Sequence, residues 1–168
     1  MAYQIAANQI GYPALSNVST SQGAALGAVV DIVNNTAAVP LGGEAIYLKA
    51  SGASIVAGSL VDYDPYLNTA TLSPATAGIG PVAVSLNVVA SGSYAWFQIA
   101  GAAAVKAPNA MTAGADVFML AATAGSIDDA AVNGEQILNA KVSTTTGTPS
   151  AGLAYLNINR PFHQGQVV

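Results

Sequence analysis

Residues 82–89 read VAVSLNVV, in which apolar residues alternate with smaller or polar ones. Because successive side chains of a β-strand point to opposite faces, this pattern predicts a strand with one buried and one exposed face. The expected buried face holds Val82, Val84, Leu86 and Val88. The same period recurs at residues 137–143 (ILNAKVS) and 153–159 (LAYLNIN), where we expect Leu138, Ala140, Val142, Ala154, Leu156 and Ile158 to point inward.

Weaker alternation marks five further segments, at residues 26–33, 44–50, 54–62, 94–100 and 116–121. Clusters of Gly, Pro, Asn and Ser separate the segments, and we expect Ser91-Gly92-Ser93 to close a hairpin between residues 82–90 and 94–100. The best helical candidate, residues 128–139, is interrupted by Gly134. The sequence therefore predicts an all-β domain over residues 23–160. We expect a single antiparallel β-sandwich or barrel, either jelly-roll-like or a small open barrel.

Two segments of the chain resemble each other. Residues 54–61 read SIVAGSLV and residues 110–117 read AMTAGADV. Each follows a predicted strand and leads into another. The two segments are either two hairpins of the same form or a coincidence in a chain rich in Ala and Gly.

The chain is poor in charge. Only twelve of its 168 residues are formally charged, which is 7%, whereas 52% are hydrophobic. An ordinary soluble domain has roughly 25% charged residues. A monomer of this size exposes roughly 7,600 Å², or about one charge per 600 Å². Such a surface is prone to self-association, so we expect much of it to be covered by other protein.

The sign and spacing of the charges exclude some partners. The formal net charge is −4, and the basic residues Lys49, Lys106, Lys141 and Arg160 are scattered. We therefore expect neither nucleic acid nor an anionic membrane to be the main partner. Residues 65–105 carry no charge, but Pro74, Pro81 and Asn87 interrupt any apolar run long enough to span a bilayer.

The two ends differ from the predicted domain. Residues 1–22 carry no charge and place apolar residues at irregular intervals, namely Tyr3, Ile5, Ile10, Tyr12 and Leu15. This pattern is typical of an extended arm docked on another surface, and the alternative is an ordinary first strand. We interpret residues 161–168 as a C-terminal tail, because Pro161 lacks an N–H for strand pairing. In that tail Phe162 would need a surface on which to bury.

Residues for catalysis or metal binding are scarce. The single histidine, His163, falls in the predicted tail, and there is no cysteine. Asp62 and Asp64 have the spacing of a glycosidase pair, but the Asp-Pro step at Asp64-Pro65 favours a turn. Calcium at Asp64 or at Asp128 and Asp129 stays an alternative, although the spacing matches no EF-hand loop. We expect no enzyme, no catalytic residue, no cofactor and no metal.

One aromatic cluster stands at the start of residues 94–100. On a strand, Tyr94 and Trp96 share one face and Phe97 lies on the other. Burial in a core together with an interface explains this arrangement at least as well as a platform for stacking sugars. The shortage of Lys and Arg argues against stacking of nucleic-acid bases.

The second half of the chain resembles a known family. The segments that carry the likeness are residues 96–101 (WFQIAG), 113–117 (AGADV), 125–129 (GSIDD) and 137–141 (ILNAK). Together they are similar to the capsid decoration (cement) proteins of tailed bacteriophages over residues 82–160. The resemblance implies a β-protein on the outer capsid surface of the virion, made in the host cytoplasm. It also implies that the protein bridges neighbouring major capsid subunits as a homo-dimer or homo-trimer.

On this interpretation we expect capsid or oligomer contacts from Tyr3, Ile5, Ile10, Tyr12, Pro13, Tyr94, Trp96 and Phe162. Deletion of residues 1–22 is expected to abolish capsid binding while the β-domain still folds. The alternative function is a glycan-binding head of a phage fibre or adhesin. That head would use Tyr94 and Trp96 together with Asp62 and Asp64.

Overall fold

The structure, a computed structural model, describes residues 4–5, 11–34, 41–76, 78–121, 123–143 and 152–165. All regular elements in these ranges are strands, which confirms the all-β prediction. No helix in the described part of the chain is long and apolar enough to cross a membrane. The strands are β1 (Gln4–Ile5), β2 (Val29–Asn34), β3 (Leu41–Ser51), β4 (Leu60–Asp64), β5 (Thr69–Leu72), β6 (Val82–Ser85), β7 (Tyr94–Lys106), β8 (Asp116–Met119), β9 (Ile127–Asp128), β10 (Gln136–Val142) and β11 (Leu153–His163).

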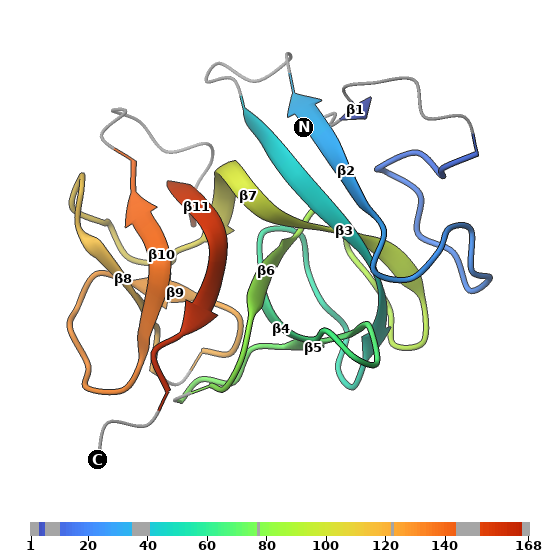
Figure 1. Cartoon of the computed structure of the whole chain (residues 1–168). Helices are drawn as coiled ribbons and strands as arrows, with labels where there is room; N and C mark the ends of the chain where they lie inside the picture. Colours follow the sequence, from blue (N-terminus) through green and yellow to red (C-terminus); the bar gives the residue numbers. More distant parts are fainter. Residues whose placement is uncertain are drawn as a thin grey trace.

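The strands form one mixed sheet in the order β1-β2-β3-β5-β4-β6-β7-β11-β10-β8-β9. The expectation of a purely antiparallel sheet is wrong, because β3 and β5 pair in parallel. The cause is the β4–β5 hairpin, which places its second strand next to β3. A further pairing joins β3 to β7, so the pairings β3–β5–β4–β6–β7 return to β3. In Figure 1, β8 to β11 gather at one side of the molecule and β2 to β5 at the other.

Strand β7 belongs to both sides of the molecule. Its residues 94–102 pair with β3, and its residues 100–106 pair with β11. Near the change of partner, Gly101 lies opposite Gly43, and the backbones of the two strands are too close for a Cβ atom at either residue. Glycine is the residue that permits such an approach.

Strand β6 is buried on both faces, which the alternation did not predict. Val82 and Val84 pack in a cluster with side chains of β7, β8, β10 and β11. Ala83 packs in a second cluster with side chains of β3, β4, β5 and β7. The expectation of an exposed face is therefore wrong for this strand, because a second core covers it. The strand also ends at Ser85, and Val88 beyond it is exposed.

The predicted hairpin between β6 and β7 is confirmed in direction but not in length. The two strands pair antiparallel. However, residues 86–93 connect them, and this connection pairs elsewhere: Val89 exchanges backbone hydrogen bonds with Ile55, and the Gly92 N–H donates to the carbonyl of Ala50. The connection thus contains a tight turn at residues 90–93, but residues 86–89 before it pair elsewhere and do not extend β6.

The likeness between residues 54–61 and 110–117 reflects a shared turn. In each, the residue after a glycine donates its N–H to the carbonyl three residues earlier, as Ser59 does to Val56 and Ala115 does to Thr112. The glycines, Gly58 and Gly114, have φ of 81° and 75°, as the third residue of a type II turn requires. Four more turns of this form occur at Gly27, Gly92, Gly125 and Gly134. A strand begins two residues after each of the six glycines, so the turn is a repeated device for starting strands.

Several strand bounds differ from the predicted ones. Strands β2, β3, β7 and β8 overlap the predicted segments, but residues 54–59 lead into β4 as a turn. Strand β5 was not predicted, because its four residues TATL follow directly after a turn and alternate over too few positions to stand out. No long apolar run marks a strand this short.

Strand β11 continues through Pro161, so the expected tail from residue 161 is wrong up to His163. Phe162 and His163 pair with Leu138 and Ile137 of β10. The pairing tolerates Pro161 because the register shifts between Leu138 and Ala140, as in a β-bulge. Left-handed backbone conformations accompany the shift, at Asn139 (φ 58°) and Arg160 (φ 47°).

The bulge also changes which side chains of β10 face inward. Ile137 is buried and Leu138 is only partly buried, contrary to the prediction, whereas Ala140 and Val142 are buried as predicted. On β11 the predicted inward residues Ala154, Leu156 and Ile158 are all buried.

The described part of residues 1–22 contacts the protein's own sheet. Ile5 pairs with Ile32 of β2, and Leu15 is buried in a cluster with Trp96. The Trp96 Nε1–H donates to the carbonyl of Pro13 at 3.1 Å, and the Asn87 amide donates to the carbonyl of Leu15 at 2.7 Å. Tyr3 and Ile10 lie outside the described residues. A deletion of residues 1–22 would therefore uncover part of the core, so its effect on capsid binding would not be separable from an effect on folding.

Candidate functional site

An open depression of about 470 Å³ lies between the β4–β5 turn and residues 79–81. We call it the acidic groove, because Asp62 and Asp64 line it together with Tyr63, Tyr66, Ile79 and Pro81. Two of these side chains are almost entirely exposed, Tyr66 at 92% and Ile79 at 87%. Phe162, which forms an isolated bridge with Pro81, is 41% exposed. Exposed apolar residues gathered around one depression are typical of an interaction surface.

The turn at one side of the groove is held by Asp64. Its Oδ1 accepts hydrogen bonds from the backbone N–H groups of Tyr66 at 2.7 Å and Leu67 at 3.1 Å. Asn68 closes the turn in a left-handed conformation, and its N–H donates to the Asp64 carbonyl. Asp64 therefore acts as the turn residue that the Asp-Pro step predicted. The turn leaves the Tyr66 ring in solvent.

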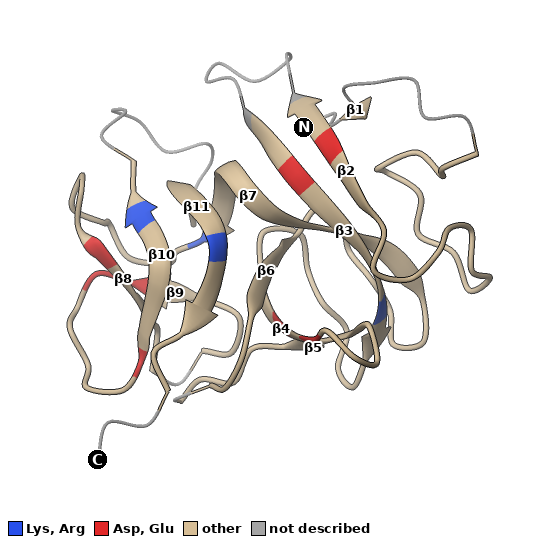
Figure 2. Cartoon of the chain, in the orientation of Figure 1, with Lys and Arg blue, Asp and Glu red and all other residues tan. Residues whose placement is uncertain are grey.

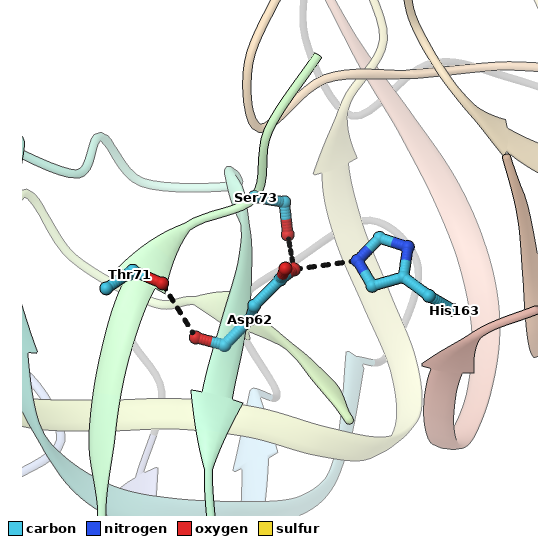
Figure 3. A network of polar contacts seen from close by, with 4 residues as sticks. All are labelled: Asp62, Thr71, Ser73 and His163. Carbon is cyan, nitrogen blue, oxygen red and sulfur yellow. Dashed lines mark hydrogen bonds and ion pairs between the residues drawn. The ribbon is translucent and has the colours of Figure 1, made fainter. Parts of the chain in front are cut away.

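Asp62, which lines the groove, lies in a network of polar contacts that Figure 3 shows. The Oδ1 atom of Asp62 accepts a hydrogen bond from the Ser73 hydroxyl and lies 2.7 Å from Nε2 of His163. The His163 side chain is completely buried, and its backbone N–H donates to the carbonyl of Gly80. The interpretation of His163 as part of a mobile tail is thus wrong, because β11 carries it into the interior.

This network lacks the arrangement of a nucleophile with its base. In a Ser-His-Asp triad the imidazole lies between the hydroxyl and the carboxylate. Here Asp62 lies between Ser73 and His163, and both contact the same oxygen. The other ring nitrogen of His163, Nδ1, is buried and has no hydrogen-bond partner among the described residues. The contacts fix the Asp62 carboxylate and tie the end of β11 to β4.

Burial raises the pKa of the Tyr63 hydroxyl above its ordinary value, and the Arg160 guanidinium lowers it to a smaller extent. Tyr63 therefore stays a neutral hydroxyl beside the two carboxylates at neutral pH. Arg160 itself forms an ion pair with Glu44 of β3.

Gly78 sets the position of the His163 ring. A Cβ atom at residue 78 would overlap Nε2 of His163, which is buried and cannot move aside freely. We expect Gly78→Ala to destabilise the protein by about 1–3 kcal/mol in urea unfolding, the usual range for overpacking. In a His163→Ala background the ring is gone, so the same change should cost almost nothing. Equal costs in both backgrounds would show that Gly78 matters for another reason.

The second acidic pair, Asp128 and Asp129, closes a loop. Asp128 accepts a hydrogen bond from the Asn109 amide at 2.8 Å, and Asp129 accepts one from the Thr112 N–H at 2.6 Å. In the described residues no group of three or more His, Cys, Asp or Glu side chains is placed to hold a metal ion. These hydrogen bonds hold the loop at residues 109–112 against Asp128 and Asp129.

Hydrogen bonds from Thr112, first from its side chain and then from its backbone N–H, lower the pKa of Asp129 below the ordinary 3.8. A lowered pKa means that Asp129 stabilises the fold above pH 3.8, and that this contribution is lost as pH falls through the folded-state pKa. We expect an NMR titration of the Asp129 carboxyl to show a midpoint below 3.8 that rises toward it in Thr112→Val. A midpoint at or above 3.8 in the unmodified protein would contradict this assignment.

The aromatic cluster is divided between core and surface. Trp96 and Phe97 are fully buried, so Trp96 offers no surface to a capsid protein or a sugar, and its two expected roles are corrected. Its ring is covered by Tyr12, with ring centroids 5.8 Å apart. Tyr94 is half-buried and stacks on Tyr47 at 6.3 Å. Of the other expected contact residues, Tyr12 and Phe162 are partly exposed, and Ile5 and Pro13 are half-buried.

Comparison with known proteins adds no assignment. No protein-family model matches the chain, and no curated protein matches it in sequence. The inferences about function therefore rest on the residues and on their arrangement.

Sequence reasoning did not single out Tyr66 or Ile79. A usable signal was present, since both are large apolar residues inside predicted turns, where no strand could bury them. The role of His163 had no such signal, because its burial depends on the continuation of β11 past Pro161.

Proposed function

We propose that this protein is a structural virion protein that binds the outside of a phage capsid and bridges neighbouring major capsid subunits. The observation that carries the proposal is the shortage of charge on the folded surface. Twelve formal charges share 7733 Å², about 640 Å² each. Figure 2 shows charged residues as a few coloured bands on an otherwise tan ribbon. Two ion pairs, Lys141–Asp116 and Arg160–Glu44, use four of the twelve.

The mechanism is passive stabilisation. A protein that binds the assembled shell but not the free subunit adds its binding free energy to the assembled state. Many copies on one lattice then act together against the pressure of a packaged genome. Assembly into a homo-dimer or homo-trimer would cover part of the charge-poor surface and present several contact sites at one joint.

For the architecture, we propose a small barrel in place of a jelly roll. The pairings from β3 through β5, β4, β6 and β7 back to β3 support a barrel of five strands. Strands β8 to β11 then form an extension that shares β7 with it.

Copy number in purified particles tests the function. We expect quantitative mass spectrometry to find the protein in numbers comparable with the major capsid protein. A handful of copies per particle would point to a fibre, vertex or tail component, and complete absence from particles would refute the proposal.

A glycan-binding head of a phage fibre or adhesin is the second candidate function. The acidic groove is a better candidate for the glycan site than the platform of Tyr94 and Trp96 expected from the sequence. Because Trp96 is buried, a stacking platform would have to be Tyr66, beside the carboxylates of Asp62 and Asp64. Saturable binding to an immobilised polysaccharide that is lost in Tyr66→Ala would favour this function. Retention of sugar binding in that variant would exclude the groove as the glycan site.

A further inference from the structure

We propose that the acidic groove receives a Lys or Arg side chain from the major capsid protein, while the exposed Tyr66 ring and Ile79 side chain that line the groove pack on apolar residues around that cation. The inference rests on the proposed function, because it identifies the surface through which the protein binds the shell. The groove residues lie outside residues 1–22 and 161–168, the two ends of the chain in which capsid contacts were expected from the sequence.

The first argument is that both carboxylates are held in place before a ligand arrives. Asp62 is fixed by Ser73 and the buried His163, and Asp64 is fixed by the backbone of the turn. In each case the described hydrogen bonds use Oδ1 alone. Each carboxylate can therefore accept further hydrogen bonds through Oδ2 with little loss of side-chain freedom.

The second argument is that the described contacts pair none of the protein's Lys and Arg side chains with a groove carboxylate. Lys141 is paired with Asp116, and Arg160 with Glu44. Lys49 lies 5.6 Å from the ring centroid of Tyr94. Lys106 ends β7 and does not line the groove. These described contacts leave Asp64 without a cationic partner, and Asp62 has only the buried His163 beside it.

The third argument is the composition of the rim. Tyr66 presents an almost fully exposed ring, and a guanidinium or ammonium group over such a face is attracted by its π electrons. Ile79 offers apolar contact on the side of residues 79–81. A cation flanked by apolar residues is a feature of a protein surface. A neutral sugar would leave the two negative charges without a partner, so we favour the protein ligand over the glycan.

Binding to capsids stripped of this protein tests the inference. Asp64→Asn removes the charge but keeps an oxygen to accept the hydrogen bonds of the turn, and Tyr66→Ala changes a side chain in solvent. The matched controls are Asp31→Asn and Val88→Ala, which alter an exposed charge on β2 and an exposed apolar residue outside the groove. We expect each groove variant to bind about tenfold more weakly, the ratio that corresponds to one charge-assisted contact. We expect both controls to bind as the unmodified protein does.

The outcomes separate the two proposals. If the unmodified protein binds capsids and the groove variants bind equally well, the groove inference is wrong and the decoration role stands. Failure of the unmodified protein to bind capsids would refute the decoration role itself. Binding that does not weaken with added salt would count against a cationic ligand. Retention of the unmodified protein, but not of Tyr66→Ala, on a neutral polysaccharide would overturn the inference in favour of a glycan.

Discussion

Replacing Gly101 with alanine is expected to destabilise the protein by about 2–5 kcal/mol. A Cβ atom on Gly101 would overlap the carbonyl oxygen of Gly42 and the Cα of Gly43 on the paired strand, so the obstacle is backbone and not a movable side chain. The residue also has φ of 93°, a left-handed conformation that costs an L-residue about 1–2 kcal/mol. Overpacking adds about 1–3 kcal/mol more.

The matched control is Gly92→Ala. Gly92 has φ of 81°, but a Cβ atom there would meet nothing within 4 Å. This variant therefore measures the backbone cost alone, and we expect about 1 kcal/mol. Urea unfolding followed by Trp96 fluorescence gives both values, because that indole is buried in the fold. Equal losses in the two variants would mean that β3 and β7 can separate at Gly101 without cost.

The crossing of β3 and β7 also shows where sequence patterns stop being informative. Strand positions were found from period-two alternation, since strands such as residues 153–159 bury the alternating apolar residues Ala154, Leu156 and Ile158, although Tyr155 is buried as well. The glycines Gly43 and Gly101 carry no local signal that they face each other. Their need for close approach arises only when Gly101 pairs with Gly43, a residue 58 positions earlier.

The glycine turns that precede the strands could be predicted from the sequence only in part. The similarity between residues 54–61 and 110–117 was interpreted as two hairpins or a coincidence, whereas the structure shows a shared turn, and the four other turns of this form in the described residues have no recognisable sequence likeness. What they share is a glycine two residues before a strand, and a Gly with positive φ is required there whatever its neighbours are. The backbone therefore requires a glycine at one position of each turn and places no such requirement on the neighbouring residues.

The candidate site was predictable only in part. Asp64 was correctly assigned to a turn from the Asp-Pro step alone. The Asp62–His163 contact joins residues 101 positions apart, and it depends on a bulge that carries β11 past Pro161. Proline in a sequence signals an interrupted ladder, yet a bulge supplies a position where the missing N–H is not needed. The prediction of a tail failed for this reason.

Gln98→Glu is expected to produce the second large loss of stability, about 3–5 kcal/mol at pH 7, the cost typical of a buried charge without a partner. Gln98 is fully buried at the register shift between β3 and β7. Its Nε2 donates toward three backbone carbonyls, those of Gly42 at 3.0 Å, Ala100 at 3.1 Å and Ala102 at 2.9 Å. The side-chain amide therefore satisfies the carbonyls that the irregular pairing leaves open. A carboxylate in the same place would face them with negative charge.

The pH dependence separates this charge effect from a loss of packing. Burial and the three carbonyls raise the pKa of the introduced carboxyl above its unfolded value of about 4.3. The destabilisation should then be smallest below about pH 4.3, where the protonated group can donate one hydrogen bond, and should grow as pH rises through the folded-state pKa. Urea unfolding of the variant and the unmodified protein at pH 4 and pH 7 measures the difference, with each pH referenced to the unmodified protein.

Gln98→Met is the control for shape without charge, because it nearly preserves volume and removes the donor. We expect it to cost about 1–3 kcal/mol, the desolvation penalty of carbonyls left without a partner, with no dependence on pH between 4 and 7. A pH-independent loss in Gln98→Glu of the same size as in Gln98→Met would show that the carbonyls tolerate the carboxyl as a neutral group throughout this range. The Gln98 amide would then stabilise the fold as a hydrogen-bond donor, and the fact that it is uncharged would not contribute to stability.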